Sequence, residues 1–234
     1  RGRIPTYSSA LRHMSVYQDY SRRKYIIAIK NIEISRSDRE FAKESPEVYI
    51  WDEQLIEYYE DLHKIIGTYA KSGLLSEMDV KPRVESRISV PAFRTTFDKY
   101  TIYSFIVEPQ KLLRVAYVAR RNIGNEHYYQ RIIKQDRINK IGDLLSKGGV
   151  FLNNIIVSFT QKPKFSPLKK DWLDWPAWLE IGVITFPEEY RSCWIIDGQH
   201  RLYASSKITN PTKIAVTAFE NLTLDKQARF FVEI

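Results

Sequence analysis

The sequence predicts an α/β fold, in which short strands alternate with amphipathic helices. Two observations support this prediction. Runs of apolar, β-branched and aromatic residues bounded by turn residues recur along the chain, as in TIYSFIV (101–107) and KIAVTAF (213–219). Between such runs lie segments with apolar residues at helical spacing, the strongest of which covers residues 129–147. This alternation of strand and helix patterns is typical of an α/β domain.

The first part of the chain contains a strand–helix–strand–helix series. KYIIAIK (24–30) and VYIW (48–51) have the composition of strands, and SRSDREFAKE (35–44) between them has that of a helix. Asp52 is a candidate N-cap for a second helix, whose apolar residues fall on one face up to Gly67. We interpret this series as a partial α/β region.

The boundary between two domains is expected before residue 96. Residues 74–95 contain Pro82 and Pro91 and alternate polar with apolar side chains, so they are predicted to form a linker or an edge strand. The predicted domains are therefore a partial α/β region with its linker over residues 1–95 and a second domain over residues 96–234.

The second domain has the better-marked elements. The predicted elements after the strand at 101–107 are, in chain order, a helix at 109–121, a helix at 129–147, a strand at 154–159, a polar loop with three tryptophans at 160–179, strands at 181–186 and 192–196, a helix at 199–206, a strand at 213–219 and a helix from about 223.

The amino-acid composition limits the classes of protein to which this chain can belong. The chain carries 36 Lys and Arg against 28 Asp and Glu, a net charge of +8, which favours a polyanionic partner such as DNA but also suits a merely solubilising surface. A single cysteine, Cys193, excludes an intramolecular disulfide and a multi-cysteine zinc site. No apolar run reaches the length of a membrane span and no signal peptide is visible, so we expect a cytoplasmic protein without a membrane partner. Neither end resembles a natural terminus, so we expect the chain to be part of a longer protein.

One stretch, CWIIDGQHRLYASS (193–206), carries the chemistry. A strand that ends in Asp197-Gly198 and passes into a helix presents backbone N–H groups at the helix start, where an anion is favoured. Gly198 leaves room for a phosphate, and Gln199, His200 and Arg201 add hydrogen-bond donors. The alternative is that Asp197 caps the helix while Arg201 pairs with Glu188 or Glu189.

The motif DGQHRL (197–202) resembles the signature of the DGQHR-domain family, which includes the DndB-type proteins associated with DNA phosphorothioation. The segments HYYQRIIKQDRINKIGDLLSKGGVFLNNIIV (127–157) and AFENLTLDKQARFFVEI (218–234) look like the blocks upstream and downstream of this signature, so the resemblance covers roughly residues 100–234. It implies a mixed-sheet domain similar to the ParB/sulfiredoxin fold. By analogy with that fold, Gly198, Gln199, His200 and Arg201 bind phosphates. Gln130 and Arg131, which belong to the upstream block, and Arg137 on the same helix are candidates for a second phosphate clamp. The alternative is a solvated basic helix face with Lys134, Arg137 and Lys140 exposed.

The resemblance implies a DNA-associated protein of a bacterial DNA-modification or phage-defence system. We expect it to bind a nucleotide, ATP or another, with Mg²⁺ on Asp197, together with DNA and other proteins of the same gene cluster; self-association as a homo-oligomer is left open. If the nucleotide is hydrolysed, Asp197 and His200 are the candidate catalytic residues. Phosphate binding by His200 is favoured over acid–base catalysis, since the sequence shows no second acid or nucleophile beside it, and the alternative role is a structural donor that holds the loop.

Two other hypotheses stay open at this stage. One is a non-catalytic DNA-binding transcriptional regulator of the DndB type. The other is a nuclease whose active residues lie upstream of Arg1, in a restriction-endonuclease-like domain of which residues 24–62 would be the end. Cys193 precedes the motif, and we expect it to belong to the core.

Overall fold

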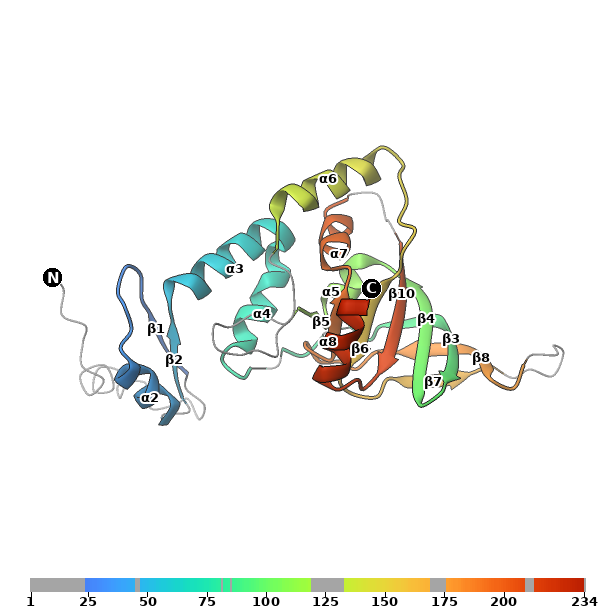
Figure 1. Ribbon diagram of the computed structural model, residues 1–234, viewed down its shortest axis with the longest axis horizontal. Helices are drawn as coiled ribbons and strands as arrows, with labels where there is room; N and C mark the ends of the chain where they lie inside the picture. Colours follow the sequence, from blue (N-terminus) through green and yellow to red (C-terminus); the bar gives the residue numbers. More distant parts are fainter. Residues whose placement is uncertain are drawn as a thin grey trace. The chain divides into compact units, whose positions relative to one another are not determined.

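The computed structural model describes residues 24–44, 47–80, 82–84, 86–118, 133–168, 176–208 and 213–233 (Figure 1). The chain divides into two compact units, Arg1–Tyr58 and Tyr59–Ile234. The sequence predicts the boundary between residues 95 and 96 instead. Residues 59–95 therefore belong to the first predicted domain but to the second unit of the structure.

The first unit contains a small parallel β-sheet. Strands β1 (Tyr25–Ala28) and β2 (Val48–Trp51) pair in parallel, and helix α2 (Arg36–Glu44) lies in the connection between them. Helix α3 (Glu53–Ile66) begins next, where the Asp52 carboxylate accepts a hydrogen bond from the backbone N–H of Leu55 at 2.9 Å. The predicted cap and the strand–helix–strand–helix series are therefore confirmed.

The second unit is a mixed sheet with helices. Its elements after α3 are the 3₁₀ helix η1 (Gly67–Tyr69), α4 (Ala70–Ser76), β3 (Ser89–Phe97), β4 (Tyr100–Val107), α5 (Pro109–Leu113), β5 (Ala116–Tyr117), α6 (Gln135–Ser146), β6 (Ile155–Phe159), β7 (Lys164–Pro167), β8 (Leu179–Thr185), β9 (Cys193–Asp197), α7 (Gln199–Ser206), β10 (Ile214–Glu220) and α8 (Leu224–Glu233). The predicted α/β class is confirmed.

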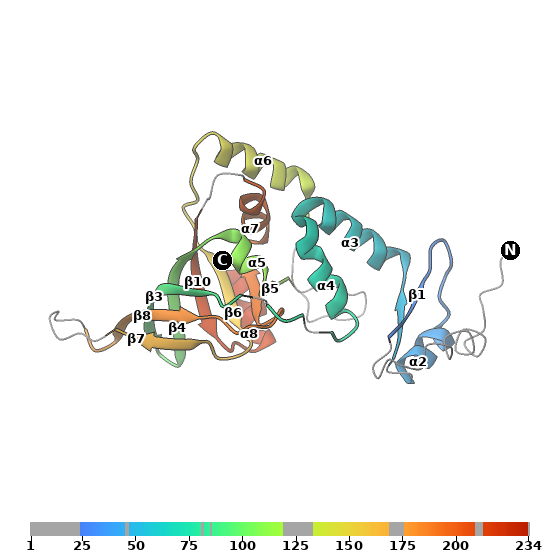
Figure 2. The same cartoon turned by 180° about the vertical axis from the view of Figure 1, so that it is seen from behind.

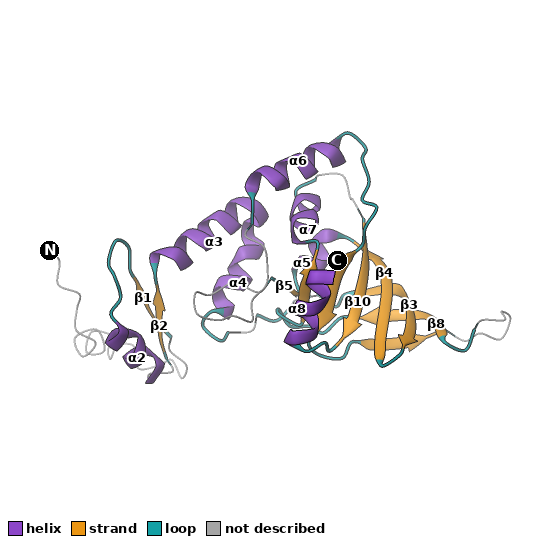
Figure 3. Ribbon diagram, viewed as in Figure 1, coloured by secondary structure: helices purple, strands orange, loops and turns teal. Residues whose placement is uncertain are grey.

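Eight strands of the second unit form one sheet in the order β5-β9-β6-β10-β4-β3-β8-β7. Most neighbours are antiparallel, but β10 runs parallel to β6 and β5 runs parallel to β9. Figure 3 shows these strands gathered in one curved sheet, and Figure 2 shows it from behind. Helix α6 packs on α7, beyond one end of the sheet (Figures 1 and 2).

The curved sheet buries an aromatic core. Tyr103, Phe159 and Ile184 are completely buried. The rings of Phe159 and Phe186 lie 5.3 Å apart in an edge-to-face arrangement, and Tyr103 meets Phe159 edge-on at 6.3 Å. Aromatic residues of β4, β6 and the segment after β8 thus hold the sheet together around β6, the strand beside β9, where the motif begins.

The structure differs from the sequence prediction at β3. Residues 89–95 were predicted as linker or edge strand, but β3 lies inside the sheet, between β4 and β8. Pro91 was the reason for not predicting an inner strand. It pairs with Val183 of β8, and the pairing of β3 with β4 starts only at Ala92. The missing N–H of the proline therefore lies beyond the end of the β4 ladder, where it costs little.

Two further predictions are wrong in part. The helix expected over 109–121 ends at Leu113, and Ala116–Tyr117 form strand β5 beside β9. Both β5 residues are buried, so sheet pairing overrides the helical pattern there. Within the loop predicted at 160–179, Lys164–Pro167 form strand β7, while residues 169–175 lie outside the described part of the chain.

Candidate functional site

The DGQHR motif lies at the predicted strand-to-helix junction. Strand β9 ends at Asp197, Gly198 takes the N-cap position with φ of +96°, and α7 begins at Gln199. A side chain at Gly198 would be strained in this left-handed conformation. Its Cβ would also approach Ile155 Cγ1 to 3.0 Å and Arg201 Nη2 to 3.2 Å. Gly198 is therefore required both by the backbone and by the tight contact with its neighbours.

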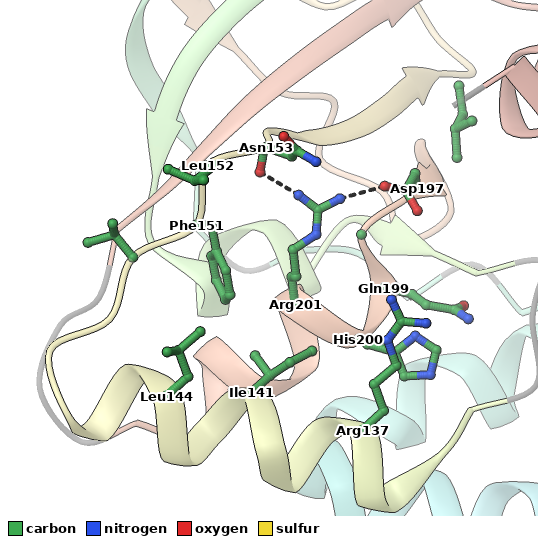
Figure 4. Close-up of a pocket in the computed structure, with 13 residues that line it drawn as sticks. Arg137, Ile141, Leu144, Phe151, Leu152, Asn153, Asp197, Gln199, His200 and Arg201 are labelled. Atoms are coloured by element: carbon green, nitrogen blue, oxygen red, sulfur yellow. Dashed lines mark hydrogen bonds and ion pairs between the residues drawn. The ribbon is translucent and has the colours of Figure 1, made fainter.

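The guanidinium of Arg201 is held within the protein. It donates to the Asp197 carboxylate at 2.5 Å and to the backbone carbonyl of Asn153, as Figure 4 shows. It also donates to the backbone carbonyl of Asn154 at 3.1 Å. Its side chain is 17% exposed. Arg201 therefore ties the β9–α7 junction to the segment that enters β6. The alternative that Arg201 pairs with Glu188 or Glu189 is wrong, since its carboxylate partner is Asp197.

His200 connects α7 to α6. It is 7% exposed, and its Nε2 accepts a hydrogen bond at 3.2 Å from the backbone N–H of Lys134, the N-cap of α6. As the acceptor of this bond, Nε2 is engaged in a structural contact between α7 and α6.

A pocket of about 490 Å³ lies between the motif and α6. The residues that line it are Arg137, Ile141, Leu144, Val150, Phe151, Leu152, Asn153, Ile196, Asp197, Gly198, Gln199, His200 and Arg201. One wall is therefore apolar and comes from α6 and the loop that follows it. The other wall is the motif. Figure 4 shows Phe151, Leu144 and Ile141 on one side, with Arg137 reaching toward Gln199 and His200.

Arg137 is the cation of this pocket that no described residue neutralises. It is exposed, and within the described segments no carboxylate lies at ion-pair distance from it. The carboxylate of the pocket lining, Asp197, is engaged by Arg201 on the opposite wall. Arg137 is thus available to an anion that enters the pocket.

Six predicted site residues meet at this pocket: Asp197, Gly198, Gln199, His200, Arg201 and Arg137. The other two, Gln130 and Arg131, lie outside the described residues. The predicted helix at 129–147 is described as α6 only from Gln135, and Lys134 before it has an extended backbone. In the described segments no group of three or more His, Cys, Asp or Glu residues could hold a metal ion, so Asp197 is the one carboxylate that the pocket itself offers.

Sequence reasoning missed the apolar wall. Val150, Phe151 and Leu152 follow Gly148-Gly149 and precede β6 without belonging to either neighbouring element. Three consecutive apolar residues in a loop were the available signal, because loops on a protein surface are usually polar.

The comparisons with known proteins address the motif region. The family model of DndB, described as DNA-sulfur modification-associated, matches residues 90–234. The chain belongs to the DndB family. The match starts at the second residue of β3 and extends past α8, so it includes all but one residue of the eight-stranded sheet, and the whole pocket. No curated protein and no solved structure matches the chain.

Family membership confirms the DGQHR resemblance and an association with DNA modification. The similarity to the ParB/sulfiredoxin fold stays a prediction. In the part of this DndB-family chain that the structure describes, no helix combines the length and the apolar character needed to cross a membrane.

Cys193 of this DndB-family chain is a core residue. It is fully buried in β9, and burial raises the pKa of its thiol far above the ordinary value. We expect the native protein to resist alkylation by iodoacetamide at pH 8, since the thiolate is the reactive form. Mass spectrometry should find one alkylated cysteine only after denaturation. Rapid alkylation of the native protein would contradict this assignment.

Proposed function

We propose that this DndB-family chain binds a nucleotide in the pocket between α6 and the DGQHR motif, as part of its role in DNA modification. The observation that carries the proposal is that one pocket combines an apolar wall with a cation, Arg137, that no described residue neutralises. A nucleotide is complementary to both features, because its flat base can pack on an apolar wall and its phosphate is negatively charged. The volume of about 490 Å³ falls in the range of small-molecule sites.

The base would pack against the apolar wall, where Phe151 offers a ring and Ile141 and Leu144 offer aliphatic surface. The phosphates would face Arg137 and the start of α7. The first-turn N–H groups of a helix have no acceptor within the helix, and the helix dipole adds positive potential there. Both features favour an anion at the same end of the pocket.

The DGQHR motif would mainly shape the pocket. Arg201 and Asp197 bind each other, and His200 Nε2 is bound to the backbone of Lys134. These contacts favour nucleotide binding over hydrolysis, because one carboxylate oxygen of Asp197 and Nε2 of His200 are engaged within the protein. A Mg²⁺ ion that arrives with the phosphates would use Asp197, whose Oδ1 is not part of the Arg201 ion pair. Magnesium would neutralise phosphate charge in that site.

Replacing Arg137 by alanine tests the proposal. We expect ATP, measured by isothermal titration calorimetry with Mg²⁺, to bind about 10- to 100-fold more weakly, because one charge-assisted hydrogen bond is lost. Lys140→Ala is the matched control, since Lys140 is an exposed cation of the same helix that does not line this pocket. The control should bind like the unmodified chain.

Two results would overturn the proposal. One is the absence of binding heat for ATP, GTP and their monophosphates with the unmodified chain. The other is an equal loss of affinity in Arg137→Ala and Lys140→Ala, which would indicate non-specific attraction to a basic surface.

A DNA-binding regulator without turnover is the second candidate function. The net charge of +8 and the exposed cations of α6 and its N-cap, Lys134, Arg137 and Lys140, support it. It differs from the first proposal in needing no nucleotide: DNA affinity should fall steeply with salt, and added ATP should not change it. The nuclease hypothesis concerns residues upstream of Arg1 and stays a prediction.

A further inference from the structure

The mouth of the pocket is bordered by exposed apolar side chains. Leu152 is 93% exposed, Val150 is 73% exposed and Leu144 is 50% exposed, and all three line the same pocket. We call these three residues the apolar rim. Single exposed leucines are ordinary, but neighbouring ones beside a pocket usually mark a contact with another molecule.

Cations flank the apolar rim. Arg137 and Lys140 lie on α6, Lys147 is its C-cap directly before the rim loop, and Lys213 immediately precedes β10, which runs in parallel beside β6. The same helix carries two acids, Asp136 and Asp143, so the surroundings of the rim keep a net positive charge. The partner that covers the rim is therefore expected to combine apolar surface with negative charge.

A free nucleotide does not account for the rim. A pocket of about 490 Å³ has the volume for such a ligand, but Leu152 and Val150 at its edge are 93% and 73% exposed to solvent. A nucleotide within a DNA strand has further bases on both sides and phosphates beyond them. Proteins that deform duplex DNA often insert an apolar side chain between two bases while cations contact the backbone.

We propose that the nucleotide in the pocket belongs to DNA, and that Leu152 inserts into a base step of the duplex. The base unstacked by this insertion enters the pocket and packs on Phe151, and Arg137 contacts its phosphate. Lys147 and Lys213 contact the flanking phosphates. This proposal rests on the proposed nucleotide site and names the molecule that supplies the nucleotide. Extruding a base into a protein pocket is a general way for proteins to reach atoms inside a duplex.

The experiment uses duplex DNA with 2-aminopurine, whose fluorescence rises when the base leaves the stack. We expect the unmodified chain to raise the fluorescence at saturation. Leu152→Ala should lose most of this rise and bind the duplex about 10-fold more weakly, as expected for losing the burial of one leucine side chain. Free ATP binding is measured separately with the unmodified chain, so that the nucleotide site is tested independently of the duplex.

Leu168→Ala is the matched control, because Leu168 is also exposed, at 58%, but follows β7 and does not line the pocket. It should behave like the unmodified chain. The inference fails if the duplex binds without a rise in fluorescence, or if Leu152→Ala and Leu168→Ala give the same signal. ATP binding without DNA binding would overturn this inference alone, whereas the absence of both would overturn the nucleotide site as well.

Discussion

Arg201→Ala is expected to lower the free energy of unfolding by about 2–4 kcal/mol. The substitution leaves the Asp197 carboxylate and the carbonyls of Asn153 and Asn154 without their guanidinium donor in a partly buried site. Because the two side chains of the ion pair are 17% and 30% exposed, water replaces part of the lost interaction, and the expected loss stays below that for a fully buried pair. Urea unfolding followed by tryptophan fluorescence measures the change.

Two companion variants separate geometry from charge. Arg201→Lys keeps the charge but loses the fork that reaches two groups at once, so an intermediate loss is expected. Arg83→Ala removes an exposed ion pair, in which Arg83, with a side chain that is 82% exposed, contacts Glu188. This variant should change the free energy of unfolding by less than about 1 kcal/mol. Equal effects of Arg201→Ala and Arg83→Ala would contradict the structural role of Arg201.

Gly198→Ala is the second variant with a large expected effect. An alanine with φ of +96° would be strained, and its Cβ would press against Ile155 and the Arg201 guanidinium. The two costs add to a loss of about 2–4 kcal/mol, which differential scanning calorimetry should register as a lower Tm.

Gly67 offers the matched control for this variant. It also has a positive φ, +59°, but among the described residues no atom lies within 4 Å of the place that an alanine Cβ would take. Gly67→Ala should therefore cost only the backbone strain, about 1 kcal/mol. If both alanine variants lose the same free energy of unfolding, the close packing around Gly198 does not contribute to stability.

The sequence predicted the elements where the local pattern and the tertiary environment agree. An apolar run, a glycine and a helical pattern predicted a strand, a turn and a helix there. The structure has β9, Gly198 and α7 in these places. The sequence misled where sheet pairing decides. Ala116 and Tyr117 continue a helical pattern, yet they become β5 because β9 offers an open edge beside them.

The candidate site could likewise be predicted from the sequence only in part. The residue types of the motif predicted a strand-to-helix junction and its polar groups. They could not predict that Arg201 would turn toward Asp197, because the carbonyls of Asn153 and Asn154 that complete its coordination come from a loop more than forty residues away in the chain. The rim around Leu152 depends likewise on how that loop meets α6.

The strand order has a consequence for synthesis of the protein. Of the eight strands, β10 is the last in the sequence, yet it lies between β6 and β4 and joins the two parts of the sheet. While the ribosome is still translating residues 214–220, β4 and β6 each present an unpaired edge of the kind that recruits strands from other molecules. A nascent chain stalled before this point is therefore expected to need chaperone protection, and one stalled well after it should close its own sheet.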